Sequence, residues 1–282
     1  MTRKYDSSLK HAQEALQVAA ANGDSVLSIS VHNKLGLLHH DMGNPVEALD
    51  CYNQVLGIAE TVGFERLGPT LTNIGLLHQE QGRYEQAEEM MKKSAACGEQ
   101  VRDRRAVSIC LGNLGIIYNQ QHRNSEAESH YRRALKLSRE IGYKHGEGIH
   151  LGNLGDHYLK MGQIEEAEKC IAEAVEIFES MNSVGAAIFR GSMALVLAKR
   201  GELKAAQQLA EAADNALRGH LPWDHAKLLC KKAQVLHMAG DTSSAVQSLQ
   251  TAQELSQSLN VLPSSELGLM LEETSRLLGS GV

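Results

Sequence analysis

The stretch LGNLGIIYNQQHRNSEAESHYRRA, from Leu111 to Ala134, decides the fold. It holds two segments in which apolar residues recur every three or four positions, and the polar break Gln121-His122-Arg123 separates them. This spacing places the apolar side chains on one face of a helix, so both segments are predicted to be helical. Together they indicate a helical hairpin.

The same pattern recurs along the chain with a period of 39 or 40 residues. A turn residue marks each copy, at Gly43, Gly82, His122, Gly162, Gly201 and Gly240. Seven residues before each turn stands a small residue, at Gly36, Gly75, Gly115, Gly155, Ala194 and Ala233. Five residues after each turn stands alanine, at Ala48, Ala87, Ala127, Ala167, Ala206 and Ala245. A fixed period of this length indicates a solenoid, in which each unit packs only on its neighbours.

Glycine in the middle of a helix costs about 1 kcal/mol relative to alanine. In four hairpins, the first helix carries a glycine seven residues before the turn in spite of this cost. The glycine predicts that the two helices of each hairpin cross at this position, where no side chain fits. The fold expected is an all-α, right-handed solenoid forming one domain over residues 1–282, with about 14 helices. Six full hairpins are predicted, at 24–62, 64–101, 103–141, 143–181, 183–218 and 222–259, with a half unit at each end: a half repeat at 5–22 and a capping helix at 263–279.

The composition limits the function classes. A formal net charge of −6 argues against a nucleic-acid-binding protein, which usually carries a basic face. No apolar run is long enough to cross a bilayer, and the N-terminus has no signal-peptide core. The five cysteines are dispersed, without a C-x-x-C pair, which is typical of reduced thiols in a cytoplasmic protein.

The spacing of small and aromatic residues resembles the tetratricopeptide repeat over about residues 5–260. The residues that carry the resemblance are Gly115, Tyr118, His122, Ala127, Tyr131 and Ala134, and the next copy matches nearly as well. The period exceeds the usual one of about 34 residues. It is similar to the long-repeat branch of kinesin light chains, Pins-type adaptors and bacterial Rap-type peptide sensors. The resemblance implies a concave face, lined by the first helices, that binds a partner segment.

Two sets of residues are predicted on that face. In the long-repeat relatives, an asparagine two residues before the crossing point often bonds the backbone of a bound peptide, which implies this role for Asn73, Asn113 and Asn153. An amide supplies both a donor and an acceptor, as a peptide backbone requires; bonding between adjacent helices is the alternative. One residue earlier stand Gly112 and Gly152, which either let neighbouring first helices pack closely or open the floor of the groove.

The predicted concave positions carry more positive than negative charge, unlike the whole chain. The lysines are Lys34, Lys160, Lys199, Lys227 and Lys231, and the carboxylates are Asp41, Glu80 and Asp156. The groove is therefore expected to accept an acidic segment or a C-terminal carboxylate, unless these charges only solvate the surface.

No catalytic, metal or cofactor site is predicted. The chain has no H-E-x-x-H motif and no ligand-spaced cysteine pair, and His39 and His78 occupy the place of packing tyrosines. Trp223 is expected to be a rim or packing residue. The sequence thus favours a non-catalytic adaptor that binds a protein or peptide. The alternatives are a peptide-sensor module of a larger signalling protein and a scaffold that self-associates through its end helices.

Overall fold

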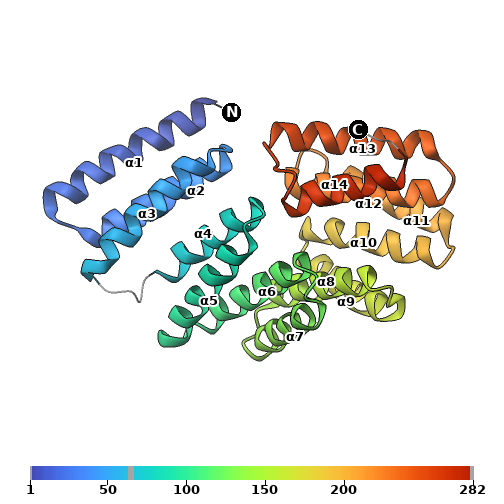
Figure 1. The fold of residues 1–282 in the computed structure, drawn as a ribbon, viewed down its shortest axis with the longest axis horizontal. Helices are drawn as coiled ribbons and strands as arrows, with labels where there is room; N and C mark the ends of the chain where they lie inside the picture. The colour runs from blue at the N-terminus through green and yellow to red at the C-terminus, as the bar shows by residue number, and fades with distance from the viewer. Residues whose placement is uncertain (1, 63–66, 280–282) are drawn as a thin grey trace. The chain divides into compact units, whose positions relative to one another are not determined.

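The computed structural model describes residues 2–62 and 67–279, and within these it contains α-helices and no strands. The chain divides into two compact units, Met1–Gln79 with Arg83–Cys110, and Glu80–Gly82 with Leu111–Val282. Each unit is described below by itself, and the predicted single domain over residues 1–282 stays a prediction. Figure 1 gives the order of the helices.

The first unit contains α1 (Thr2–Asn22), α2 (Ser25–Asp41), α3 (Pro45–Val62), α4 (Gly68–Glu80), α5 (Tyr84–Gln100) and the first turns of α6 (Arg104–Gln120). The second unit continues with α7 (Asn124–Glu140), α8 (Lys144–Lys160), α9 (Ile164–Ser180), α10 (Gly185–Lys199), α11 (Leu203–Leu217), α12 (Pro222–Met238), α13 (Thr242–Ser258) and α14 (Glu266–Leu277). The fourteen described helices fall within the predicted hairpins and end segments to within a few residues, so the all-α solenoid of hairpins is confirmed. The predicted start of the second hairpin, at residue 64, lies outside the described residues.

The periodic turn residues all take a left-handed backbone conformation. Five of the six predicted positions are glycine, with φ between 69° and 85°, and His122 adopts φ 58° although it carries a side chain. Gly279 also has a left-handed φ, 65°, and lies 39 residues after Gly240. Gly279 therefore ends the predicted C-terminal half unit at the repeat period, and α14 is a first-type helix.

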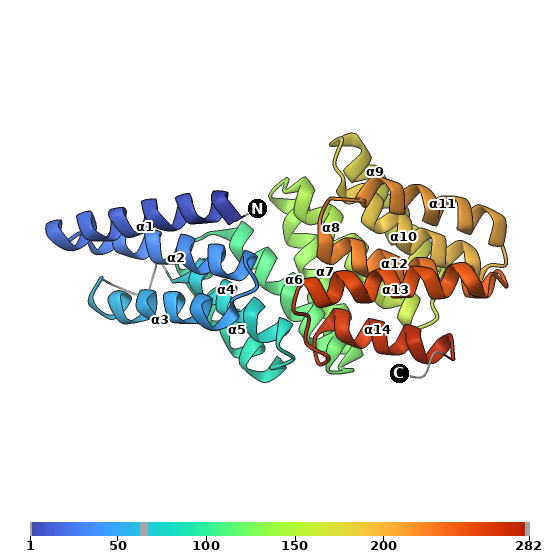
Figure 2. The ribbon, with the colours of Figure 1, turned by 90° about the horizontal axis from the view of Figure 1, so that it is seen from above.

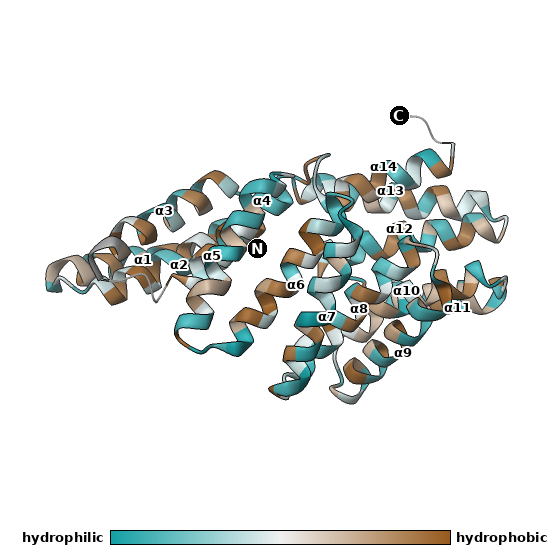
Figure 3. Cartoon of the chain, turned by 60° about the horizontal axis from the view of Figure 1, so that its bottom comes forward, coloured by the Kyte–Doolittle hydropathy of each residue, from teal (hydrophilic) through white to brown (hydrophobic). Residues whose placement is uncertain are grey.

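The small residues before the turns are the crossing points that the spacing predicted. A Cβ atom at Gly115 would lie 2.6 Å from the ring of Tyr131, and one at Gly36 would lie 2.3 Å from the ring of Tyr52. The alanines five residues after the turns are completely buried. The four hairpins with a glycine at the crossing point therefore close on a large side chain of their second helix, which is Tyr52, Met91, Tyr131 or Ile171. Hydrophilic and hydrophobic residues follow one another along each helix (Figure 3).

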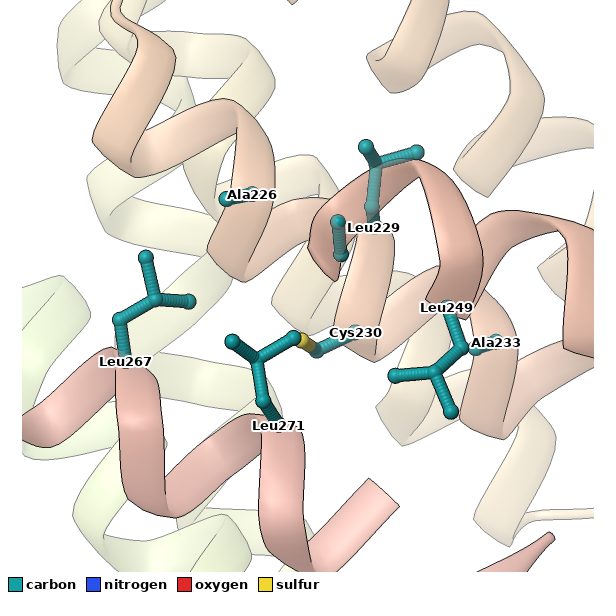
Figure 4. Packing of buried hydrophobic residues seen from close by; sticks show 8 residues of the cluster. Ala226, Leu229, Cys230, Ala233, Leu249, Leu267 and Leu271 are labelled. Carbon is teal, nitrogen blue, oxygen red and sulfur yellow. The ribbon is translucent and has the colours of Figure 1, made fainter. Parts of the chain in front are cut away.

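The C-terminal helix α14 packs on α12 and α13 and closes the second unit, as both ribbon views show (Figures 1 and 2). Leu267 and Leu271 of α14 lie against Ala226 and Cys230 of α12, and the Cys230 thiol points toward Leu271 (Figure 4). Full burial of a leucine side chain contributes about 1.5–3 kcal/mol. Trp223 packs against this cluster, so its predicted packing role is confirmed.

Side chains cap the starts of α2, α13 and α14. Ser183 Oγ accepts a hydrogen bond from the Gly185 N–H at 3.1 Å, but the N-cap residue of α10 is Val184, which makes no side-chain cap bond. Asp24 caps α2 by accepting a hydrogen bond from the Leu27 N–H at 2.9 Å. Ser265 caps α14 in the same way, through the Gly268 N–H. Across the described helices, none is both long and apolar enough to span a bilayer.

Candidate functional site

The second unit contains a concave pocket of about 730 Å³. Its floor comes from the first helices α8, α10 and α12, α14 lines it from the C-terminal side, and the end of α6 contributes Asn119 and Gln120. First helices face the pocket because the second helices α9, α11 and α13 pack on their other side. The pocket thus lies on the face predicted from the repeat.

Five of the predicted site residues line this pocket: Asn153, Lys160, Lys199, Lys227 and Lys231. Asn153 is half-buried on the middle of α8, whereas Lys160 and Lys199 are exposed at the C-terminal ends of α8 and α10. A cation is favoured at the end of a helix because the carbonyl groups there carry partial negative charge. The side chains of Asn153, Lys160 and Lys199 are therefore accessible to a ligand in the pocket.

Lys231 is an internal tie between three consecutive first helices. Its ammonium group donates to Asp156 Oδ2 of α8 at 2.8 Å and to Ser192 Oγ of α10 at 2.6 Å, and its side chain is only 12% exposed. A buried charge needs such partners, since desolvation without them costs several kcal/mol. We conclude that Lys231 holds α8, α10 and α12 together.

Lys227 is also paired inside the protein, with Glu266 of α14. Burial alone would lower the pKa of Lys227, but the Glu266 carboxylate more than offsets this, so the pKa lies above its ordinary value. The sequence analysis treated both Lys227 and Lys231 as groove cations for a ligand. The structure gives each of them a carboxylate partner from another helix.

The excess of positive charge expected for this face is not found in the pocket. The complete lining of the pocket contains five lysine and arginine side chains and five carboxylates. The prediction counted only first-helix positions of the six hairpins, and it omitted Asp224 and the acidic residues of α14, which are Glu266, Glu272 and Glu273. The pocket as a whole is neutral.

Gly112 and Gly152 are covered by rings from the next first helix. A Cβ atom at Gly112 would lie 2.4 Å from the His150 imidazole, and one at Gly152 would lie 1.9 Å from the Phe189 ring. Gly191 receives Leu228 in the same way. Of the two alternatives offered for these glycines, the geometry is that of close packing between neighbouring first helices. They do not form an open groove floor.

The other predicted residues lie outside this pocket lining. Lys34 is exposed on α2 and Asn73 is half-buried on α4, both in the first unit. Asn113 is half-buried on α6, in the second unit. The side chain of Asp41 lies outside the described residues. The binding role assigned to the three asparagines stays a prediction.

A buried charge cluster between α11 and α12 escaped the sequence analysis. The Asp214 carboxylate accepts from His225 Nε2 at 2.7 Å and from Lys232 Nζ at 2.7 Å, and its side chain is 4% exposed. Burial alone would raise the pKa of Asp214, but the two hydrogen bonds more than offset this and hold the pKa well below its ordinary range. One signal for this cluster is present in the sequence. The positions 13 residues after the four earlier turn residues are apolar, namely Leu56, Ala95, Leu135 and Val175, whereas the equivalent position in the fifth hairpin is Asp214.

Histidines and cysteines do not assemble into a metal site in the part of the chain that is described. His39 and His78 are half-buried, as expected of residues that replace packing tyrosines. The five cysteines are free thiols.

Comparison with known proteins places these repeats in one family. A family model described as tetratricopeptide repeat matches residues 1–61 and 67–140, and two further models of the same description match residues 151–180 and 187–212. No curated protein matches the sequence.

Several solved structures share the fold at low sequence identity. Aspartyl phosphate phosphatase F from Bacillus subtilis superposes with a TM-score of 0.70 at 12% identity, over 95% of this chain and 76% of that one. The Rap conjugation gene regulator of the plasmid pLS20, solved in complex with a Phr peptide, gives 0.69 at 16% identity, over 93% and 77%. A putative kinesin light chain from Podosopora anserina gives 0.50 at 15% identity, over 68% and 95%.

Proposed function

Because the chain belongs to the tetratricopeptide repeat family, we propose that it is a non-catalytic adaptor that binds a segment of a partner protein in the pocket of the second unit. One observation carries the proposal. Asn153, Lys160 and Lys199 lie on different helical turns of α8 and α10, yet they line the same 730 Å³ pocket. A volume of this size lies within the range of about 300–1,000 Å³ that is typical of ligand-binding pockets.

The chemistry of the pocket suits a peptide. The Asn153 amide offers a donor and an acceptor to a peptide backbone whatever its side chains are. Half-buried Ile149 and Ile188 offer apolar contact beside it. Generic affinity would come from the amide and specificity from the flanking side chains.

Among the structural neighbours, the plasmid regulator with its Phr peptide supports a peptide as the ligand. It also favours the second candidate, a peptide-sensor module in which the ligand changes the packing of the helices. Small-angle scattering of the chain with and without a bound peptide separates the two candidates. A fixed radius of gyration supports the adaptor, and a changed one supports the sensor.

The proposal is tested by selecting binders from a random peptide library with the purified chain as bait. We expect the double variant Asn153→Ala with Lys199→Glu to lose about tenfold in affinity for the selected peptides. Lys204→Glu, an exposed charge reversal on the second helix α11, is the matched control and should bind like the original chain. Equal binding by the double variant, or no enriched peptide at all, contradicts the proposal.

Two further parts of the proposal concern the setting of the protein. Free thiols suit a reducing compartment, which supports a cytoplasmic location. Self-association through α1 or α14 also stays a prediction, motivated by the exposed Val18 and Leu277 on these helices. Light scattering at several concentrations tests it, and a constant monomer mass would rule it out.

A further inference from the structure

The charges that line the pocket of the second unit are not evenly spread once the charges that form ion pairs with one another are set aside. Lys231 pairs with Asp156, Lys227 with Glu266, and Arg276 with Glu272 at 2.7 Å. Within the described chain, no carboxylate pairs with Lys160 or Lys199, and no cation forms an ion pair with Asp224 or Glu273. Two unpaired positive charges therefore stand on α8 and α10, and two unpaired negative charges stand on α12 and α14.

The two pairs of charges differ in how far they reach into solvent. Lys160, Lys199 and Glu273 are exposed, while Asp224 is half-buried at the start of α12. Burial raises the pKa of Asp224, and the nearby Lys227 only partly offsets this. The exposed charges best placed to meet a ligand are thus the two lysines at one end and Glu273 at the other.

Apolar side chains line the same pocket. Ile188 on α10 and Met270 on α14 are half-buried, and Leu269 on α14 is exposed. An exposed leucine beside two half-buried apolar side chains in a concave surface gains free energy when a ligand covers it. The pocket therefore presents unpaired positive charge on α8 and α10, unpaired negative charge on α12 and α14, and apolar side chains on α10 and α14.

We infer that the pocket selects a dipolar segment: an apolar residue with acidic residues on the side facing α8 and α10, and basic residues on the side facing α14. This inference rests on the proposed function and names the class of ligand. It replaces the uniformly acidic partner expected from the first helices alone, because a segment of one sign would meet repulsion at one end of the pocket.

The test compares peptide selections on three baits, which are the original chain, Lys160→Glu with Lys199→Glu, and Glu273→Lys. The original chain is expected to enrich peptides with opposite charges on the two sides of an apolar residue. The lysine double variant should enrich peptides with basic residues on both sides, and Glu273→Lys should enrich peptides with acidic residues on both sides. Lys204→Glu is the matched control and should enrich the same peptides as the original chain. Circular dichroism verifies that all the baits are folded.

Affinities of individual peptides complete the test. Reversing the charge of both lysines should lower the affinity for a dipolar peptide by about tenfold at low salt. Replacing the acidic residues of that peptide by lysine should restore its binding to the variant. Enriched peptides without charge, or of a single sign on the original chain, would overturn the inference while leaving the proposed function in place. A selection that enriches no peptide would overturn the proposed function itself.

Discussion

A methyl group at residue 152 has no room beside the Phe189 ring. Gly152→Ala places a Cβ atom 1.9 Å from a ring carbon that is itself buried. Overpacking of this kind costs about 1–3 kcal/mol, and the better helix propensity of alanine returns only about 1 kcal/mol. We expect Gly152→Ala to lower the free energy of unfolding in urea denaturation.

Gly57→Ala is the matched control for this substitution. Gly57 lies inside α3 with nothing within 4 Å of its Cβ position, so the same change should stabilise the chain by about 1 kcal/mol. Adding Phe189→Leu to Gly152→Ala should recover part of the lost stability. A Gly152→Ala chain as stable as the Gly57→Ala chain would show that the two first helices are not tightly packed at this point.

His150, which covers Gly112, makes the stability depend on pH. Burial lowers the pKa of His150 from 6.5 to about 4, so the folded chain keeps a neutral imidazole while the unfolded chain takes up a proton. The contribution of neutral His150 to the free energy of unfolding is therefore complete above pH 6.5, and it is lost as the pH falls toward 4. We expect His150→Leu to flatten the fall in melting temperature over this range. The exposed His220, changed to glutamine, should leave the fall unchanged.

At the scale of helices, the Asp214 cluster fixes α12 against α11. Asp214→Asn removes the negative charge to which both Lys232 and His225 are hydrogen-bonded. Breaking a buried ion pair in this way lowers the free energy of unfolding by about 3–5 kcal/mol. Because the folded pKa of Asp214 is depressed, its contribution is present above the unfolded pKa of about 4 and is lost below it. The difference in unfolding free energy between the original chain and the variant should thus be large at pH 7 and shrink below pH 4. A small difference at pH 7 would contradict the assignment.

Contacts within one hairpin could be predicted from the sequence, whereas contacts between hairpins could not. Gly115 indicated a crossing because a glycine inside a helix has a known cost, and Tyr131 lies there. The ring that covers Gly112 comes from His150 in the next repeat, and the partner of Lys231 is Asp156, 75 residues away. Such pairs depend on the rotation from one repeat to the next, which the period does not specify.

For the candidate site, the sequence predicted the face on which the pocket lies but misjudged the charge of the pocket. Asn153, Lys160 and Lys199 line the pocket because equivalent positions of successive first helices face the same side of the repeat array. Glu266 and Glu273 were missed because the concave positions were counted over the six hairpins only. The half unit that holds α14, a seventh first helix followed by Gly279, was left out of that count. A helix that ends the repeat array thus supplies the negative wall of the pocket.

At the scale of the whole molecule, the central claim is that the pocket of the second unit is where this tetratricopeptide repeat protein holds its partner. Hydrogen exchange of the full chain, with and without a library-selected peptide, tests it most directly. Protection is predicted in α8, α10, α12 and α14, whose residues line the pocket, with little change in α9, α11 and α13. Protection confined to those second helices, or to α1–α5, would contradict it.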